Sequence, residues 1–415
     1  MNSLLTPALR GCAFLLCLAV ISCGGGGDGL SGGSSSGGTT TGSNVVSVTV
    51  SGGPAGVNAI NTLYTTVTVC VPNTTTCQTI DNIQVDTGSY GLRLLSQALT
   101  LTLPVATAAS GGGLVECTEF DDGYSWGPVA LVDLKISGES ASAVPVQLIG
   151  DARYPTAPSD CSAPAPSAEN TVASFGANGI LGIGPFVQDC GSFCVGNIPE
   201  PIQYYGCTTA TACTSTLVPL SAQVQNPVAM FATDNNGTII SLTSVASAGA
   251  ASVTGSLIFG IDTESNNASG TETVIPVADT GFITTVFDST TLTDSFIDSG
   301  SNASYFNVPT GSTAITLCPS SGGSSTSITT FYCPASPETL TASFVLISNS
   351  TVNASFEVAN ADTVSISVTA YPGLAGTSIA PDSFDWGLPF FFGRRVANAI
   401  EGAATSVGTG PYIAY

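Results

Sequence analysis

The sequence carries one short peptide twice, and this repeat constrains the fold more than any other feature. The first copy is Ile83–Ser89 (IQVDTGS) and the second is Ser295–Ser301 (SFIDSGS). Each runs from strand-forming residues into Asp, a hydroxyl residue, Gly and Ser, which is typical of a strand ending in a turn. We set aside a third match, Asp279–Gly281, because Ala278 precedes it and Phe282 follows it. The two remaining copies indicate an internal duplication.

A second short motif follows each copy at nearly the same distance. An apolar-apolar-Gly step ends 96 residues after Asp86, and another ends 95 residues after Asp298. Two halves of this kind, related by a pseudo-twofold axis, would bring the two Asp turns face to face. The residues expected to support the turns are Ile180, Leu181 and Gly182 in the first half and Phe391, Phe392 and Gly393 in the second.

Strand-like segments fill most of the rest of the chain. Polar and β-branched residues alternate between turn residues, and 47 Gly and 24 Pro supply the turns. Only residues 91–99 show a weak 3.6-residue apolar period, which makes them the one helix candidate. The sequence therefore predicts an all-β protein. The predicted strands are residues 45–50, 63–71, 80–85, 129–136, 146–149, 255–260, 274–277, 295–297, 342–347 and 364–369.

The ionisable residues exclude several kinds of function. The net charge is −22 and Lys135 is the only lysine, so the chain cannot neutralise the phosphates of a nucleic acid. The sequence contains no histidine, which excludes Ser-His-Asp and Cys-His catalysis and His-ligated zinc. An enzyme made from this chain must use carboxylates, hydroxyls or a bound metal.

Three peptides together resemble the bilobed pepsin-like aspartic peptidases. They are Val85–Ser89, Asn178–Gly184 and Ile297–Ser301, which match that family's Asp-Thr/Ser-Gly-Ser/Thr motifs and an apolar-apolar-Gly step. Ser256–Asp262 and Val274–Val277 are similar to the opening of the family's second lobe. The Tyr-Gly-Leu-Arg-Leu and Phe-Gly-Arg-Arg segments are similar to a little-characterised bacterial lipoprotein branch. The resemblance rests on motifs, but it extends over most of the chain.

This resemblance implies a fold and a site. The fold is all-β with two lobes, residues 45–220 and 221–415, about a pseudo-twofold axis with a cleft between them. Asp86 and Asp298 would jointly activate a water molecule for peptide hydrolysis, without a cofactor or metal. Residues implied to support the pair are Thr87, Gly88, Ser89, Ser299, Gly300 and Ser301.

Two carboxyl groups suffice for this chemistry on physical grounds. Hydrolysis of a peptide needs one group that takes a proton from water and another that gives a proton to the substrate. Like charges a few ångströms apart cannot both ionise easily, so such a pair holds one shared proton. The proton belongs to the pair rather than to Asp86 or Asp298 alone.

The sequence also departs from the family. Arg93 stands where a bulky aromatic residue is usual after the first motif, and Arg394–Arg395 follow Gly393 where an Asp is frequent. A β-hairpin at residues 120–126 is expected to close over an extended substrate that pairs through its backbone. The flap residue of this hairpin has two candidates: Phe120 fits the register, whereas Tyr124 keeps the hydroxyl group.

The N-terminus predicts export and lipidation. Residues 1–22 read as a signal peptide, because the apolar run at 12–21 is too short to span a bilayer. Cys23 ends a segment that resembles a bacterial lipobox, and residues 23–44 form a Gly/Ser/Thr-rich tether. Gly24 favours the outer membrane in a Gram-negative cell. Ordinary signal-peptide cleavage beside a chance cysteine is the alternative.

The cysteine count fits an oxidising compartment. Of 13 Cys, ten remain after Cys12, Cys17 and Cys23 are removed. A metal cluster is disfavoured because there is no Cys-x-x-Cys pair and no His. Five disulfides are expected, although the sequence does not determine connectivity. The neighbouring pairs are Cys70/Cys77, Cys190/Cys194, Cys207/Cys213 and Cys318/Cys333, which leaves Cys117 and Cys161.

Three functions remain open at this point. The first is a lipid-anchored aspartic endopeptidase that acts on peptide or protein substrates. It would bind no nucleic acid, and it would be attached to the membrane only through its lipid anchor. The second is a non-catalytic binding module of the same fold on the cell envelope. The third is a structural envelope or adhesin-like β protein with coincidental motifs. A monomer is expected.

Overall fold

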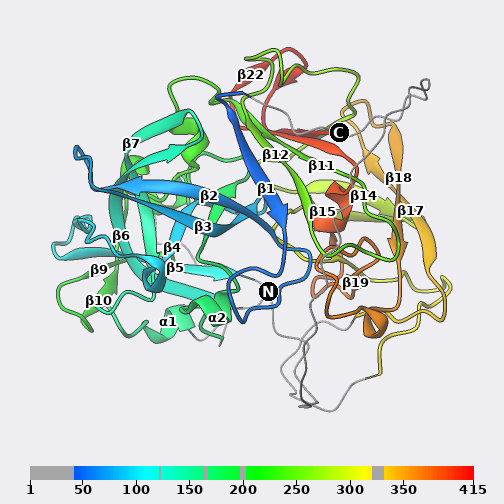
Figure 1. Ribbon diagram of the computed structural model, residues 1–415, viewed down its shortest axis with the longest axis horizontal. Helices are drawn as coiled ribbons and strands as arrows, with labels where there is room; N and C mark the ends of the chain where they lie inside the picture. The colour runs from blue at the N-terminus through cyan, green and yellow to red at the C-terminus, as the bar shows by residue number, and fades with distance from the viewer. Residues whose placement is uncertain (1–41, 121–122, 163–166, 197–201, 320–330) are drawn as a thin grey trace, which may run out of the picture.

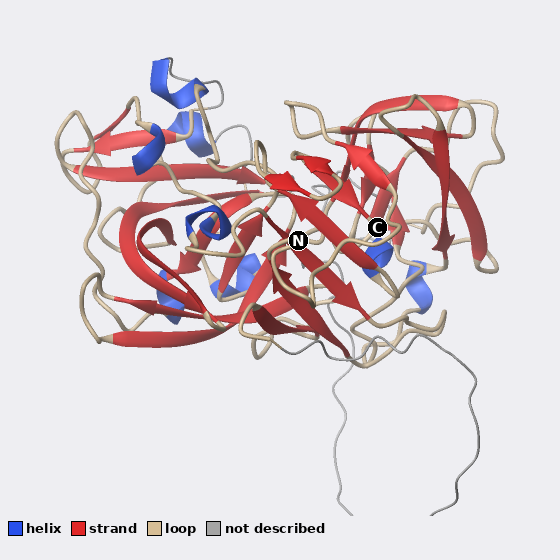
Figure 2. Cartoon of the chain, turned by 90° about the horizontal axis from the view of Figure 1, so that it is seen from above, coloured by secondary structure: helices blue, strands red, loops and turns tan. Residues whose placement is uncertain are grey.

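The computed structural model describes residues 42–120, 123–162, 167–196, 202–319 and 331–415. The predicted signal peptide, Cys23 and residues 23–41 of the tether lie outside these ranges. Strands dominate and the helices are short (Figures 1 and 2). The strands up to residue 220 are β1 (Val45–Val50), β2 (Leu63–Cys70), β3 (Cys77–Asp86), β4 (Tyr90–Leu95), β5 (Gly113–Phe120), β6 (Gly123–Ile136), β7 (Glu139–Ile149), β8 (Gly179–Ile183), β9 (Tyr204–Cys207) and β10 (Cys213–Ser215).

The second half of the chain is built from strands in the same way. Its strands are β11 (Gly237–Leu242), β12 (Val253–Phe259), β13 (Val274–Pro276), β14 (Ile283–Phe287), β15 (Thr290–Ile297), β16 (Ser304–Phe306), β17 (Glu338–Val345), β18 (Thr351–Val358), β19 (Ala375–Gly376), β20 (Phe384–Trp386), β21 (Arg395–Ala399), β22 (Ala404–Thr405), β23 (Gly408–Thr409) and β24 (Tyr412–Ala414). The helices of the whole chain are α1 (Ser159–Ser162), α2 (Val172–Phe175), α3 (Phe193–Gly196) and the 3-10 turns η1 (Ser96–Ala98), η2 (Leu220–Ala222), η3 (Pro227–Met230), η4 (Ala361–Thr363) and η5 (Leu388–Phe391).

Two large sheets organise the molecule. In the first, strands β6, β7, β4, β8, β3 and β2 close into a barrel, because β2 also pairs with β6. The same sheet continues through β1, which pairs antiparallel with β12 of the second half. The second sheet has seven strands in the order β18-β17-β14-β15-β20-β16-β19. Figure 1 shows the two lobes side by side, with β1, β11 and β12 between them. The all-β, two-lobed fold is confirmed, and the boundary at residues 220/221 stays a prediction.

The sequence repeat corresponds to a repeat of topology. In the first half, β3 runs parallel to β8, and β8 pairs antiparallel with β4. In the second half, β15 runs parallel to β20, and β20 pairs antiparallel with β16. Each half thus contains the same three-stranded unit, with β8 or β20 in the middle. Each Asp motif lies in the turn between the two outer strands, β3 and β4 in the first half and β15 and β16 in the second. The pseudo-twofold relation predicted from the duplicated peptide follows from this arrangement.

One apolar core extends through both halves. Alternating inward residues of β1–β4, β6–β8 and β11–β20 belong to a single buried cluster. Its second-half part is rich in aromatic rings, with Trp386 stacked on Phe384 at 4.2 Å between ring centroids. Trp386 is fully buried, and its indole N–H donates to Thr285 Oγ1 at 3.1 Å. Aromatic packing therefore supports the strand that lies beside Asp298.

The five predicted disulfides are all present. Their half-cystines lie within bonding distance, and four of the five bonds close loops of fewer than 20 residues. Local loops of this kind can be recognised from spacing, whereas Cys117–Cys161 joins β5 to α1 across 44 residues. The bonds are Cys70–Cys77, Cys117–Cys161, Cys190–Cys194, Cys207–Cys213 and Cys318–Cys333.

Three secondary-structure predictions need correction. The helix candidate at 91–99 is strand β4 followed by η1, because its residues pair with β7 and β8 on both sides. The strand predicted at 364–369 is a turn after η4, and Ile366 is 91% exposed there. Strand β7 does not begin after Pro145 but runs through it, with Pro145 opposite Leu131 of β6. Leu131 donates its N–H to Pro104 O, so Leu131 and Pro145 are not a hydrogen-bonded pair and the missing N–H of the proline leaves no ladder bond unmade.

Candidate active site

The two repeated turns bring Asp86 and Asp298 together. Asp86 is the last residue of β3, and Asp298 directly follows β15. The two residues are 3% and 6% exposed, and their carboxyl groups are hydrogen-bonded to each other. Side chains 212 residues apart in sequence thus form one buried carboxyl pair.

Each carboxyl group is held by the same two kinds of donor. Gly88 N–H donates to Asp86 Oδ1 at 2.7 Å, and Gly300 N–H donates to Asp298 Oδ1 at 2.7 Å. Ser301 Oγ donates to Asp298 Oδ2 at 2.8 Å, and Ser89 Oγ donates to Asp86 Oδ2. A hydroxyl and an amide thus orient each carboxyl group from within its own turn.

The hydroxyl residues between Asp and Gly lock the two turns to each other. Thr87 Oγ1 donates to Ile297 O at 3.0 Å and accepts from Ser299 N at 2.9 Å. Ser299 Oγ donates to Val85 O at 2.9 Å and accepts from Thr87 N at 3.1 Å. Four bonds related by the pseudo-twofold axis therefore join the two halves directly beneath the carboxyl pair. Each turn needs Thr or Ser at this position because the side-chain hydroxyl both donates a hydrogen bond to the opposite turn and accepts one from it.

Gly300 and Gly88 leave the space that the carboxyl groups occupy. A Cβ built on Gly300 would lie 2.5 Å from Asp86 Oδ1, and one on Gly88 would lie 2.7 Å from Asp298 Cγ. Neither distance is compatible with a real side chain, and each contact is with the carboxyl group of the opposite half. The glycines are therefore required by the close approach of the two turns.

We predict that Gly300→Ala displaces Asp86 and lowers the unfolding free energy by about 1 to 3 kcal/mol, because the added Cβ would overlap the carboxyl group of the opposite turn. Gly196→Ala is the matched control, because a Cβ there meets no atom within 4 Å. The measurement is denaturant unfolding of both variants. Equal stability of the two variants would contradict the tight approach at Gly300.

Burial is the main cause of the unusual ionisation of the pair. Desolvation, followed by the charges of Asp86 and Asp385, holds the pKa of Asp298 well above its usual range, and the Ser301 hydroxyl opposes this in part. Asp385 lies on β20, where it pairs in register with Phe296. Asp298 therefore keeps a proton at pH values where an exposed carboxyl group would lose it.

This raised pKa predicts how stability changes with pH. As pH rises above the ordinary pKa of an aspartic acid, Asp298 deprotonates first in the unfolded chain, so the folded state loses stability until the raised pKa is reached. The loss from Asp298 alone is at most about 1.4 kcal/mol per pH unit. We expect unfolding free energies from denaturant titrations to fall less steeply with pH in Asp298→Asn than in the wild type. Parallel slopes would contradict the raised pKa.

The triplet Phe391–Gly393 does not play the part predicted for it. In the first half, Gly182 is the register partner of Asp86, so Ile180, Leu181 and Gly182 lie beside the first turn as predicted. In the second half, β15 pairs with Phe384–Trp386, and Asp298 N–H donates to Trp386 O at 3.0 Å. Gly387 is thus the counterpart of Gly182, and Phe391 and Phe392 pack in the core around η5. The matching spacing of 95 and 96 residues was a coincidence, and the arginines after Gly393 are no departure at this position.

The predicted hairpin is present, and its two flap candidates lie on opposite faces. Strands β5 and β6 pair antiparallel, with Phe120 opposite Gly123 and Glu119 opposite Tyr124. The Phe120 ring packs on Phe175 with 5.9 Å between centroids. Tyr124 packs instead against the cluster around the Cys117–Cys161 disulfide. Which of the two would meet a substrate stays a prediction, and residues 121–122 lie outside the described ranges.

Sequence reasoning missed several residues beside the carboxyl pair. The amide of Gln84 donates to Gly300 O at 2.9 Å and so reaches the opposite turn. Tyr90 is close enough for the charges of Asp86, Glu401 and Asp298 to add to burial in raising the pKa of its phenol. Asp385 is a further buried carboxyl group, and its charge contributes to the raised pKa of Asp298. An Asp inside the apolar run 384–392 was the one signal that could have identified it.

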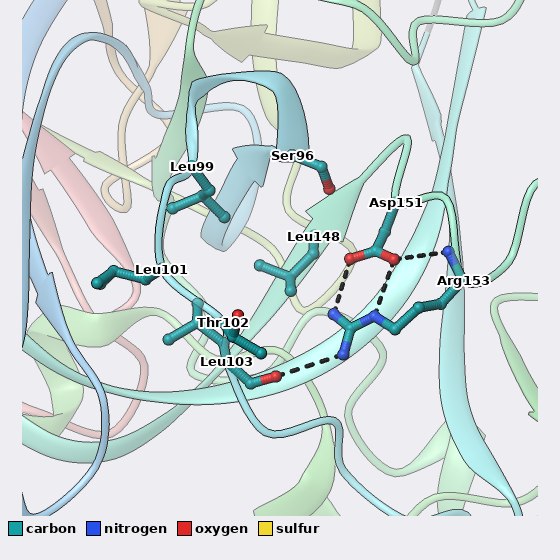
Figure 3. A pocket seen from close by; sticks show the side chains of 8 residues that line it. All are labelled: Ser96, Leu99, Leu101, Thr102, Leu103, Leu148, Asp151 and Arg153. Carbon is teal, nitrogen blue, oxygen red and sulfur yellow. Dashed lines mark hydrogen bonds and ion pairs between the residues drawn. The ribbon is translucent and has the colours of Figure 1, made fainter.

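Two further groupings lie away from the pair. A pocket of about 200 Å³ in the first lobe is lined by leucines and by the Asp151–Arg153 ion pair, and by none of the predicted site residues (Figure 3). Cys318, Cys333 and Asp362 form the one metal-like grouping found among the described residues. Its sulfur atoms are joined in a disulfide, so they offer no thiolate ligands.

Comparison with known proteins places the chain in a family. No curated protein matches the sequence. Among solved structures, the fold is similar to that of the aspartic proteinase from Irpex lacteus, with 14% identity, a TM-score of 0.48, and coverage of 89% of this chain and 96% of that chain. No helix in the described part of the chain is long and apolar enough to cross a membrane. Residues 40–415 match a family model described as "Protein of unknown function (DUF3443)". The chain therefore belongs to this family.

Proposed function

We propose that this protein is an aspartic endopeptidase that hydrolyses peptide bonds in extended polypeptides. The observation that carries the proposal is the buried, hydrogen-bonded pair of Asp86 and Asp298. A pair that served only to brace the two halves would not need two carboxyl groups, because Thr87 and Ser299 already supply four bonds between the turns. Burial of a carboxyl pair is costly, and such costs are characteristic of functional sites.

The mechanism follows from one shared proton. The ionised carboxyl group takes a proton from a water molecule, whose oxygen attacks the carbonyl carbon of the scissile bond. The protonated carboxyl group donates to the carbonyl oxygen, so that a neutral tetrahedral intermediate forms. The newly protonated carboxyl group then gives its proton to the leaving nitrogen as the C–N bond breaks, and one hydroxyl of the intermediate returns its proton to the other carboxyl group, which forms the product carboxylic acid and leaves the pair with one shared proton. Gly88 N–H, Gly300 N–H, Ser89 and Ser301 keep both groups oriented throughout.

A cleavage assay resolved by pH tests the proposal. The full chain, purified in detergent, is given an unfolded protein substrate from strongly acidic to neutral pH. We expect cleavage in acid that declines as the pH rises through the raised pKa of Asp298, because the pair then loses its shared proton. A statine-type transition-state analogue should bind and inhibit. A folded protein that neither cleaves nor binds the analogue at any pH would instead be a binding module of the same fold.

The proposal includes a lipid anchor at Cys23. The Ser22-Cys23-Gly24 segment and the Gly/Ser/Thr-rich residues that follow it support this part. We expect the outer membrane of a bacterial envelope as the location. Metabolic labelling with a fatty-acid analogue should mark the wild type and leave Cys23→Ser unmarked. Secretion of unlabelled wild-type protein would refute the anchor and leave the peptidase proposal unaffected.

A further inference from the structure

Arg93 is a charged side chain in the interior of the first lobe. Its side chain is 1% exposed, and its guanidinium contacts two carboxyl groups, Glu116 Oε1 at 2.6 Å and Asp189 Oδ2 at 3.0 Å. Glu116 and Asp189 are themselves almost fully buried. Burial, together with the neighbouring Glu116, raises the pKa of Asp189 well above its usual range. The two carboxyl groups thus lie directly against the buried guanidinium and offset its charge, as a buried ion network requires.

The other contacts of Arg93 reach in two directions. Its Nη1 donates to Tyr90 O at 2.5 Å, one residue beyond Ser89, which holds Asp86. Its Nε donates to Thr118 Oγ1 at 3.0 Å, on strand β5 of the hairpin. One rigid, planar group thus spans from the turn that carries Asp86 to the hairpin.

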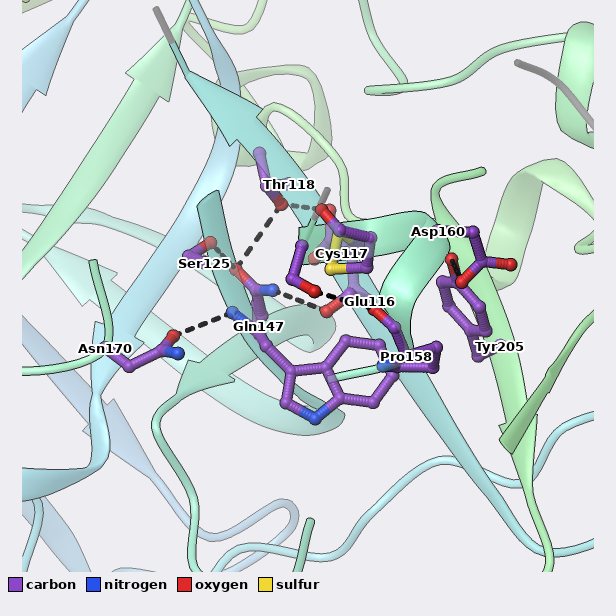
Figure 4. Close-up of a disulfide and its surroundings, with 12 residues drawn as sticks. Glu116, Cys117, Thr118, Ser125, Gln147, Pro158, Asp160, Asn170 and Tyr205 are labelled. Carbon is purple, nitrogen blue, oxygen red and sulfur yellow. Dashed lines mark hydrogen bonds between the residues drawn. A yellow bond between two sulfur atoms is a disulfide. The ribbon is translucent and has the colours of Figure 1, made fainter. Parts of the chain in front are cut away.

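A polar layer extends these contacts across both strands of the hairpin. Thr118 Oγ1 donates to Glu116 Oε1 at 3.0 Å, and Gln147 Nε2 donates to Glu116 O at 3.0 Å. Ser125, on β6, donates to Gln147 Oε1 at 3.0 Å. Figure 4 shows these side chains gathered beside the Cys117–Cys161 disulfide. The face that holds Glu116 and Thr118 also carries Phe120, because alternate residues of a strand share a face.

A third element joins the cluster through Asp189. Tyr204 donates its hydroxyl to Asp189 at 2.8 Å and accepts from Val224 N at 2.8 Å. Gln203 Nε2 donates to Asp189 Oδ2 at 2.9 Å. Strand β9, which pairs with β5, is therefore held by the same carboxyl group that binds Arg93. Hydrogen bonds to charged groups are directional and strong, so they specify one position of the hairpin where apolar contacts would allow several.

We propose that Arg93 is a positioning residue that fixes the β5–β6 hairpin relative to the turn bearing Asp86. The inference rests on the proposed peptidase function in one respect, namely that the hairpin positions a substrate. The pseudo-twofold counterpart of Arg93 is Tyr305, which pairs with β20 as Arg93 pairs with β8. The Tyr305 hydroxyl donates to Asn302 Oδ1 within its own turn. The hydrogen bonds of the Arg93 guanidinium to Tyr90 O and Thr118, which we call the guanidinium tie, thus belong to the half of the molecule that carries the hairpin.

Backbone amide hydrogen exchange of the full chain tests the tie without reference to activity. In Arg93→Met we expect exchange in residues 113–120 and 123–129 to rise by about tenfold or more, with little change in β17 and β18. Arg93→Lys should give a smaller rise, because one ammonium cannot replace three guanidinium nitrogens in different directions. Arg153→Met is the matched control, since the side chain of Arg153 is 42% exposed and its ion pair with Asp151 lies in the same lobe. An unchanged hairpin, or an equal rise in β17 and β18, would overturn the proposal.

Two additions keep the test decisive. Arg93→Met leaves two carboxyl groups without a cation, so Arg93→Met/Glu116→Gln/Asp189→Asn removes all three charges together if the single variant does not fold. In folded variants, kcat/KM should fall by about 10²-fold, with a parallel loss of affinity for the statine-type analogue. Selective loosening of the hairpin in a chain whose wild type never cleaves would support the tie and refute the peptidase function. Full activity with a loosened hairpin would overturn the positioning role.

Discussion

Replacing either Asp86 or Asp298 by Asn is expected to abolish peptide cleavage. The variant keeps the size of the side chain and its bonds to Gly88 or Gly300, but the pair can no longer both take and give a proton. Loss of a general acid or base usually costs about 10² to 10⁴ in rate, and here one substitution removes the shared proton altogether. The effect on kcat should therefore reach at least the upper end of this range, measured by single-turnover cleavage at the acidic optimum.

The third copy of the tripeptide supplies the matched control. Asp279 precedes Thr280 and Gly281 in the same order as the site residues, but it is exposed. Asp279→Asn should cleave at the wild-type rate. The two site variants should also fold, because an amide removes charge repulsion from a buried pair. Substantial cleavage by folded Asp86→Asn or Asp298→Asn would exclude the shared pair as the catalytic group.

Trp386→Ala is expected to cause the largest loss of stability. Its ring is fully buried between Phe384 and Phe344, with 4.8 Å between the centroids of Trp386 and Phe344. Substitution removes this packing and leaves Thr285 without its indole donor. Truncation of a buried Trp to Ala costs about 3 to 5 kcal/mol, to be measured by denaturant unfolding. We also expect lower activity, because Trp386 O accepts the backbone bond from Asp298.

Ile366→Ala is the control for this measurement. Ile366 is 91% exposed, so its removal should change the unfolding free energy by no more than about 0.5 kcal/mol. The chain has two Trp residues, and Trp126 remains as the fluorescent reporter in Trp386→Ala. A cost below about 1 kcal/mol for Trp386→Ala would mean that the aromatic cluster does not support the second half in the way its geometry indicates.

The success of the sequence predictions depended on how local each signal was. The turns at Asp86 and Asp298 could be predicted because each is a contiguous peptide, and a duplicated strand and turn implies a twofold partner. Short disulfide loops such as Cys190–Cys194 were equally accessible. The strand beside Asp298 was not, because an apolar-apolar-Gly step recurs by chance in an apolar chain. Only the pairing of β15 with β20 identified Trp386 and Gly387 as the counterparts of Leu181 and Gly182.

Sequence alone determined the chemical repertoire of this protein and the two turns that carry it. Without histidine, carboxyl groups remained as the candidate proton carriers, and the two Asp peptides identified which carboxyl groups these would be. The tertiary structure decided what surrounds them. It placed Arg93 against Glu116 and Asp189, and it set Asp385 beside the second turn. These contacts join residues far apart in sequence, and their existence depends on strand register and burial, which no local pattern of residues records.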